Sequence, residues 1–208
     1  MQRSTAKVQT RAKVRSEAPA TAFVPNRTIV LVGLMGAGKT SIGRLLAKRL
    51  GKTFVDSDHE IERVTGVRIP VIFEIEGESG FRAREERMLA GLVEGADVVL
   101  ATGGGVVLSP QNRRLLAENG IVVYLRAAVR DLWARTRHDR NRPLLRTGEP
   151  LAVLEQLYAD RDPLYREVAH IIVDTGDQSL GSLVHKLERK LEQFEAAARR
   201  SDSPARTG

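Results

Sequence analysis

Short apolar runs alternate along the chain with longer segments in which apolar residues recur every three or four positions. The short runs are continuously apolar, which is typical of strands covered on both faces of a parallel sheet. The predicted strands are Thr28–Val32, Thr53–Asp56, Val98–Ala101, Ile121–Leu125 and a fifth that contains Ile171–Val173. This alternation predicts an α/β fold with helices on both faces of one parallel sheet.

The helical segments are recognised by their apolar faces and by their ends. Lys39–Leu50 places its apolar residues on one helical face, and Gly51 follows at a position where many helices stop. The pair Ser109-Pro110 predicts another helix start, because serine caps helices and proline suits the first helical position. Further helices are predicted over Asp58–Thr65, over Glu78–Val93 and from about Ser179 to Ala197.

The amino-acid composition excludes several classes of protein. The chain has 208 residues and no cysteine, which excludes disulfide scaffolds, thiol catalysis and cysteine-ligated zinc. No run approaches the roughly 20 apolar residues of a membrane helix, and the first residues lack the apolar core of a signal peptide. We therefore expect one globular domain in the cytoplasm, with no membrane partner.

The net charge of +7 is concentrated near the start of the chain. Residues 1–27 contain six basic residues and one acidic residue, whereas residues 28–194 contain 24 basic and 23 acidic residues. We expect a disordered basic arm over 1–27, a domain over 28–197 and a disordered tail over 198–208. An arginine-rich segment also suits a transit peptide, so import into a plastid stays an alternative. The nearly neutral body argues against a nucleic-acid partner.

A phosphate-binding motif follows the first predicted strand. Residues 33–40 read GLMGAGKT, which matches G-x-x-x-x-G-K-[ST] between a strand and a helix. In such a loop the backbone N–H groups and the helix N-terminus surround an anion. Lys39 is expected to reach the β- and γ-phosphates of a nucleoside triphosphate, and the Thr40 hydroxyl can ligate Mg²⁺.

Two acidic residues follow the second predicted strand, at the edge where open parallel sheets bind ligands. Asp56 and Asp58 could divide the work, one lying near Mg²⁺ and the other accepting a proton or hydrogen bond from a substrate hydroxyl. The segment 98–102 has no acidic residue where a Walker-B aspartate would stand, so Asp56 is the candidate for the outer metal contact. The alternative is that Asp58 only caps the next helix.

A charged helix and a glycine run add candidates for binding an acid. Arg82 shares a helical face with Glu85 and Glu86, so it is either part of a solvated face or a fork held rigid for an anionic substrate. The glycine run 103–105 follows the third strand and lets a ligand approach the backbone closely, although a flexible turn would look the same. We expect this strand end to lie beside the phosphate loop.

Residues 135–148 contain five arginines and one acidic residue, Asp139. This composition suits a lid that brings cations over the phosphates when the site closes. A solvated basic loop or an RNA contact is the alternative, but no aromatic residues are interleaved to stack bases.

In this order, the motifs resemble the shikimate kinase family. The resemblance covers roughly residues 28–192 and is carried by the phosphate loop, Asp56-Ser57-Asp58, Phe81-Arg82 with Glu85, Gly103–Gly105, Arg142-Pro143-Leu144-Leu145 and Arg161-Asp162-Pro163-Leu164-Tyr165. It implies a three-layer P-loop kinase fold with a five-stranded parallel sheet, a lid and a substrate-binding helical segment. The basic arm has no role in this set of motifs, and the lid is richer in arginine than they require.

The resemblance also implies a site. Shikimate would contact Asp58, Arg82, Gly103, Gly104, Gly105 and Arg161, with Glu85 orienting Arg82. ATP would contact Gly36, Ala37, Gly38, Lys39, Thr40, Ser41, Arg135, Arg142 and Gln178. Mg²⁺ would be held by Thr40 and, through water, by Asp56. The catalytic residues would be Asp58 as the partner of the acceptor hydroxyl, with Lys39 and Arg142 on the phosphates.

The expected function is therefore ATP-dependent phosphorylation of the 3-hydroxyl of shikimate by a monomeric enzyme. Two alternatives stay open at this point. Arg82 and Arg161 would also suit another hydroxy acid, as in a gluconate kinase of the same fold. An ATP-regulated nucleic-acid-binding module using the basic arm is the alternative from a different class.

Overall fold

The computed structural model describes residues 25, 27–94, 97–137, 149–176 and 178–201. Most of the expected arm, most of the expected lid with Arg142, and residues 202–208 of the expected tail lie outside this part of the chain.

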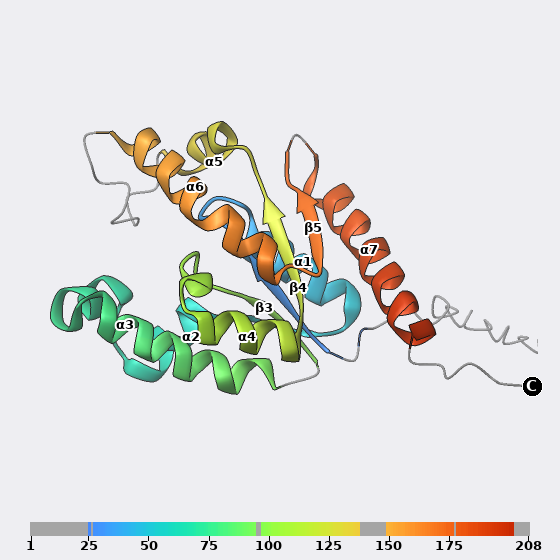
Figure 1. The fold of residues 1–208 in the computed structure, drawn as a ribbon, viewed down its shortest axis with the longest axis horizontal. Helices are drawn as coiled ribbons and strands as arrows, with labels where there is room; N and C mark the ends of the chain where they lie inside the picture. Colours follow the sequence, from blue (N-terminus) through green and yellow to red (C-terminus); the bar gives the residue numbers. More distant parts are fainter. Residues whose placement is uncertain (1–24, 26, 95–96, 138–148, 177, 202–208) are drawn as a thin grey trace, which may run out of the picture.

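Five parallel strands form one sheet in the order β2-β3-β1-β4-β5 (Figure 1). The strands are β1 (Thr28–Val32), β2 (Thr53–Asp56), β3 (Val98–Ala101), β4 (Gly120–Arg126) and β5 (Ile171–Asp174). All five residues of β1 are buried, as are the first six of β4, because helices cover the sheet on both faces. The predicted parallel α/β sheet is confirmed.

Seven helices and a short 3₁₀ turn surround the sheet within the described residues. They are α1 (Lys39–Leu50), α2 (Ser57–Thr65), α3 (Ile69–Val93), η1 (Val106–Leu108), α4 (Pro110–Asn119), α5 (Val129–Thr136), α6 (Pro150–Val168) and α7 (Leu180–Ser201). Helices α1 and α7 pack together on one face, and α4 and α6 cover the other (Figure 1). Helix α7 extends to Ser201, whereas the sequence predicted its end at about Ala197 and a disordered tail from residue 198.

Helix α2 and the first part of α3 form a unit beside the main core, whereas Leu89 and Val93 near the end of α3 belong to the main core. Ile61, Ile72 and Phe81 make a small cluster of their own, separate from the large cluster that the sheet shares with its covering helices. Helix α3 is bent at Gly77, whose φ of 69° and ψ of −176° are not helical. The structure therefore contains a helical segment that packs largely on itself, at the side of the sheet where β2 lies.

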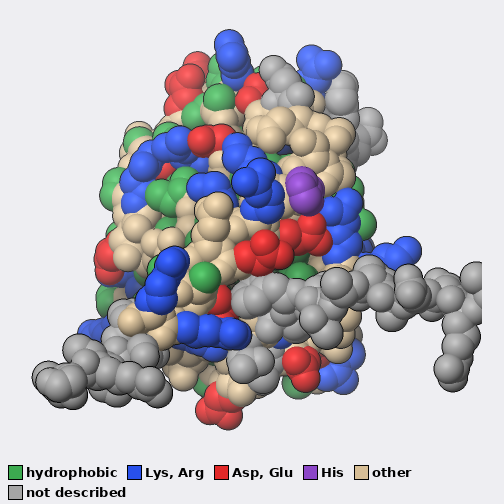
Figure 2. Space-filling view, turned by 90° about the vertical axis from the view of Figure 1, so that its right-hand side faces the viewer, with side chains coloured by type: hydrophobic (Ala, Val, Ile, Leu, Met, Phe, Trp, Pro, Cys, Tyr) green, Lys and Arg blue, Asp and Glu red, His purple; other side chains and the backbone are tan. Residues whose placement is uncertain are grey.

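The surface carries charges of both signs. Figure 2 shows the side on which α7 lies, with acidic and basic side chains interspersed among smaller apolar areas. None of the helices in the described ranges is both long and apolar enough to cross a membrane.

Candidate active site

The register of the sheet brings three motif-bearing strand ends together. Leu31 of β1 and Asp56 of β2 both pair with Ala101 of β3, so the segments that follow these strands leave the sheet at one level. Strand β3 lies between the other two. The expectation that the glycine run lies beside the phosphate loop is confirmed.

The phosphate loop connects β1 to α1, as the motif predicts. Lys39 lies across the loop, with its Nζ donating hydrogen bonds to the carbonyl oxygens of Gly33 at 2.7 Å and Leu34 at 3.0 Å. The N-cap residue of α1, Gly38, provides no side-chain cap. Backbone N–H groups at the start of the helix thus have no side-chain acceptor there, as an anion site requires.

Thr40 and Asp56 form a pair at the expected metal position. The Thr40 hydroxyl donates to Asp56 Oδ2 at 3.1 Å, which joins the first turn of α1 to the end of β2. Among the described residues there is no cluster of three or more His, Cys, Asp or Glu side chains that could hold a metal by itself. A hydroxyl and a single carboxylate suit Mg²⁺ that arrives with nucleotide phosphates and keeps several waters.

Asp56, and not Asp58, caps helix α2. Asp56 Oδ1 accepts a hydrogen bond from the Asp58 N–H at 3.2 Å. The side chain of Asp58 is therefore not used as the cap, and its buried Oδ1 has no hydrogen-bond partner among the described residues. Burial, reinforced by the charges of Asp56 and Glu85, raises the pKa of Asp58 to about 6. A buried acceptor near a phosphate loop is the environment that a general base needs.

Arg82 is held by two acidic residues of its own helix. Its Nη1 lies 2.7 Å from Oε2 of Glu85, whose side chain is 1% exposed, and its Nη2 lies 3.1 Å from Oε1 of Glu78, which is 63% exposed. Glu86 accepts instead from the hydroxyl of Ser109. Of the two expected partners of Arg82, only Glu85 makes the contact, and this buried pair fixes the guanidinium.

The other oxygen of Glu85 faces the glycine run. Glu85 Oε1 is buried without a hydrogen-bond partner in the described part of the chain. A Cβ atom on Gly103 would lie 2.9 Å from this oxygen and 2.8 Å from Asp58 Oδ1. Two unpartnered carboxylate oxygens therefore converge beside Gly103, where only glycine leaves them room.

Arginines from two helices flank the same glycines. A Cβ atom on Gly105 would lie 2.6 Å from Cζ of Arg82, and Arg161 of α6 donates from Nη1 to the Gly104 carbonyl at 3.2 Å. The Gly103 N–H donates to the hydroxyl of Ser57, a residue to which the sequence reasoning assigned no role although it lies inside the quoted motif. Two cations and two carboxylates therefore surround the glycine run, an arrangement suited to an acid that also carries hydroxyl groups.

Two of the expected nucleotide residues in the described part of the chain, Arg135 and Gln178, lie near the segment after β5. Arg135 of α5 donates from Nη2 to the Thr175 carbonyl at 2.6 Å and from Nη1 to the Gly36 carbonyl at 3.3 Å, so it joins the phosphate loop to the segment after β5. Gln178 lies exposed in that segment, and its backbone N–H donates to Gly176 O.

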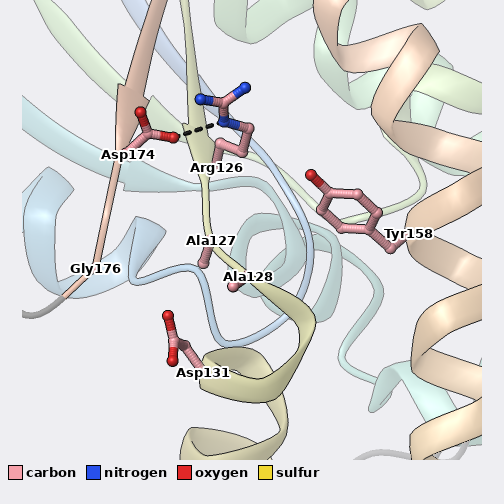
Figure 3. A pocket seen from close by; sticks show the side chains of 7 residues that line it. All are labelled: Arg126, Ala127, Ala128, Asp131, Tyr158, Asp174 and Gly176. Carbon is pink, nitrogen blue, oxygen red and sulfur yellow. Dashed lines mark hydrogen bonds and ion pairs between the residues drawn. The ribbon is translucent and has the colours of Figure 1, made fainter.

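A cavity of about 310 Å³ opens at the ends of β4 and β5 (Figure 3). It is lined by Arg126, Ala127, Ala128, Asp131, Tyr158, Asp174 and Gly176. Arg126 and Asp174 pair across the two strand ends, and Tyr158 points toward them from α6. None of the sequence-predicted site residues lines this cavity, and no sequence motif marked it.

Comparisons with known proteins identify the family of this chain. The family model described as shikimate kinase matches residues 35–192. A shikimate kinase of Burkholderia thailandensis is 60% identical over 168 residues, which are 81% of this chain and 91% of the relative. A shikimate kinase from Acinetobacter baumannii, solved in complex with shikimate, is 48% identical with a TM-score of 0.75, covering 85% of this chain and 96% of that chain.

A more distant structure shares the fold alone. A gluconokinase from Sinorhizobium meliloti has a TM-score of 0.61 at 17% identity, covering 87% of this chain and all of that one. The family model spans most of this chain, and the Burkholderia relative matches along nearly its whole length. This chain therefore belongs to the shikimate kinase family of enzymes.

Proposed function

We propose that the chain transfers the γ-phosphoryl group of ATP to the 3-hydroxyl of shikimate. The observation that carries the proposal is the cluster around the glycine run. There Arg82 and Arg161 offer a binding site for a carboxylate, and Asp58 offers an oxygen with no hydrogen-bond partner among the described residues. The kinase of Acinetobacter baumannii, which shares this fold, binds shikimate. A cyclohexene ring with one carboxylate and several hydroxyl groups matches these donors and acceptors.

The nucleotide side is assigned to the phosphate loop. Residues 36–41 and the N-terminus of α1 would surround the phosphates, with Lys39 leaving the carbonyls of Gly33 and Leu34 to contact them. Thr40 and, through water, Asp56 would hold Mg²⁺. When bound, the ion neutralises charge on the phosphate oxygens. Arg135, Arg142 and Gln178 remain proposed contacts of ATP.

On the acceptor side, Asp58 holds the 3-hydroxyl in line with the γ-phosphorus. The hydroxyl oxygen forms the new P–O bond while the bond to the β,γ-bridging oxygen of ATP breaks, and ADP leaves. The hydroxyl proton passes to the Asp58 carboxylate, whose Oδ1 has no hydrogen-bond partner within the described ranges. Positioning and charge stabilisation supply most of the rate, because phosphoryl transfer requires little covalent participation by the protein.

The first experiment measures ADP release from MgATP with shikimate, with gluconate and with quinate as separate acceptors. We expect release that depends on shikimate. Release with gluconate instead would keep the kinase and overturn the substrate, and it would favour the alternative of another hydroxy-acid kinase.

A variant set then tests the roles. Asp58→Asn is expected to retain ATP binding and lose most turnover, and Arg82→Ala is expected mainly to weaken shikimate binding. Lys39→Ala should reduce both phosphate binding and transfer. Near-normal turnover of the Asp58 variant, or unchanged shikimate affinity of the Arg82 variant, would show that the corresponding role is misassigned.

A further inference from the structure

Tyr165 of helix α6 contacts the glycine run of the proposed substrate site. Its side chain is fully buried, and its hydroxyl donates a hydrogen bond to the Gly104 carbonyl oxygen at 2.5 Å. The same oxygen accepts from Nη1 of Arg161, one turn earlier in α6, at 3.2 Å. Both acceptor positions of one backbone carbonyl are therefore occupied by donors from one helix.

Gly104 lies close both to the phosphate loop and to Arg161. A Cβ atom at this residue would lie 3.7 Å from Gly33 O, 3.7 Å from Met35 N and 3.8 Å from Arg161 Nη1. A movement of this peptide group would therefore change its distance to the phosphate loop and to the arginine together.

Because the Gly104 carbonyl is held by two hydrogen bonds, the direction of the next backbone N–H group, that of Gly105, is also determined. In a planar trans peptide the carbonyl of Gly104 and the N–H of Gly105 point in opposite directions. With the carbonyl held toward α6, the Gly105 N–H is directed to the opposite side. Within the described ranges, neither the Gly104 nor the Gly105 N–H donates to another residue; Gly104 is half-buried and Gly105 is buried.

The phenol ring of Tyr165 is itself held rigidly. It stacks on the ring of Tyr124 with centroids 4.9 Å apart and an interplanar angle of 27°. Tyr124 uses its own hydroxyl elsewhere, donating to Asp162 Oδ1 at 2.8 Å. Burial raises the pKa of Tyr165, so its hydroxyl stays protonated and remains a donor at physiological pH.

We infer that Tyr165 is a positioning residue for the acid substrate: its hydroxyl fixes the Gly104 carbonyl, and so orients the Gly104–Gly105 peptide and Arg161 before shikimate binds. The inference rests on the proposed function, since it takes the glycine run and Arg161 as parts of the shikimate site. Tyr165 does not touch the substrate and acts only through these two groups.

The test compares Tyr165→Phe with the matched control Tyr124→Phe. Both variants keep the stacked rings and lose one buried hydroxyl, but only the first loses the bond to Gly104. For Tyr165→Phe we expect the Kd and KM for shikimate to rise about fivefold, the loss typical of one neutral hydrogen bond. The KM for ATP should change less than twofold. For Tyr124→Phe both KM values should change less than twofold.

Calorimetric titration of shikimate into the wild-type chain comes first, because it separates this inference from the proposed function. A wild-type chain that does not bind shikimate would overturn the proposed function. If the wild type binds, a Tyr165→Phe variant with unchanged Kd for shikimate would overturn the positioning role. Parallel losses of ATP and shikimate affinity, matched by Tyr124→Phe and by a lower Tm, would also overturn it, because they would indicate general loosening of α6.

Discussion

The carboxyl group of Asp58 lowers the free energy of unfolding at neutral pH, although the proposed reaction needs this group as a proton acceptor. Its pKa is raised from 3.8 to about 6 in the folded protein, so the folded state holds its proton more tightly than the unfolded chain does. Protonation therefore favours folding, and the stability contribution of Asp58 falls as the pH rises from about 4 to about 6. Above that range the ionised group leaves a constant penalty on the order of 3 kcal/mol.

We therefore predict that Asp58→Asn makes the metal-free protein more stable at pH 8, although it loses most turnover. Denaturant unfolding in EDTA, without nucleotide, measures the free energy of unfolding of both proteins from pH 4 to pH 8. The gain should be small at pH 4 and should grow to its full size by about pH 7. A gain that is absent at pH 8, or equal at every pH, would contradict the raised pKa.

Glu85 and Glu78 allow a test of which carboxylate fixes the position of the Arg82 guanidinium. Both contact the guanidinium, but Glu85 is buried and Glu78 is mostly exposed. Because water screens exposed pairs, we predict that Glu85→Gln raises the KM for shikimate about tenfold and that Glu78→Gln changes it less than twofold. Steady-state kinetics at saturating ATP provide the measurement. Equal effects of the two variants would argue against a rigid, buried fork.

At the scale of elements, helices with one clear apolar face were predictable and helices shaped by tertiary contacts were not. The prediction of α1 over Lys39–Leu50 is confirmed residue for residue, because one apolar stripe and Gly51 mark it locally. Helix α6 escaped prediction, because its buried face carries Arg161 among Leu154, Tyr165 and Val168, and because Pro163 lies within it. An arginine on a core-facing stripe breaks the apolar pattern that a sequence reader relies on.

The start of α3 was missed for a related reason. The sequence predicted a helix over Glu78–Val93, but α3 begins at Ile69 and bends at Gly77. Its first part contributes Ile72 to a core of only a few residues, while Ile75 stays 74% exposed. Such a short segment contains too few buried positions to establish a helical period.

Gly77 is the residue on which the bend of α3 depends. Its combination of positive φ and extended ψ is essentially restricted to glycine, and a Cβ there would meet no atom within 4 Å, so only backbone strain opposes a substitution. We predict that Gly77→Ala lowers the free energy of unfolding by about 1–3 kcal/mol. It should also raise the KM for shikimate, because Arg82 follows the bend.

Gly66 provides the matched control for this substitution. It also has a positive φ and open surroundings, but its left-handed conformation at the end of α2 is accessible to other residues at about 1 kcal/mol. Gly66→Ala should therefore cost less stability and leave the KM for shikimate within twofold. Denaturant unfolding and steady-state kinetics with shikimate are measured for both variants. Equal changes in the free energy of unfolding and in the KM for shikimate would show that the bend at Gly77 has no special role.

At the scale of the whole molecule, the sheet register explains which parts of the site could be predicted. Parallel strands end at one edge, so the phosphate loop, Asp56 and the glycine run had to meet once the strands were recognised. The contact between Arg161 and Gly104 spans 57 residues and depends on how α6 packs over the sheet. The convergence of Asp58 and Glu85 beside Gly103 likewise requires α2 and α3 to be placed in space.

The distribution of charge gives the last prediction, because it separates a kinase from a nucleic-acid-binding module. Residues 28–194 are close to electrical balance, with 24 basic and 23 acidic residues, whereas six basic residues precede them. Every described contact of the proposed site lies within residues 28–194.

We therefore predict that a chain lacking residues 1–24 retains kcat and both KM values within twofold. It should lose whatever salt-dependent binding to duplex DNA the full chain shows at low ionic strength. Coupled kinetics and a salt titration of DNA binding test both halves. DNA binding that persists without residues 1–24, or turnover that falls more than tenfold, would mean that the balanced body or the basic segment has a role that the site does not explain.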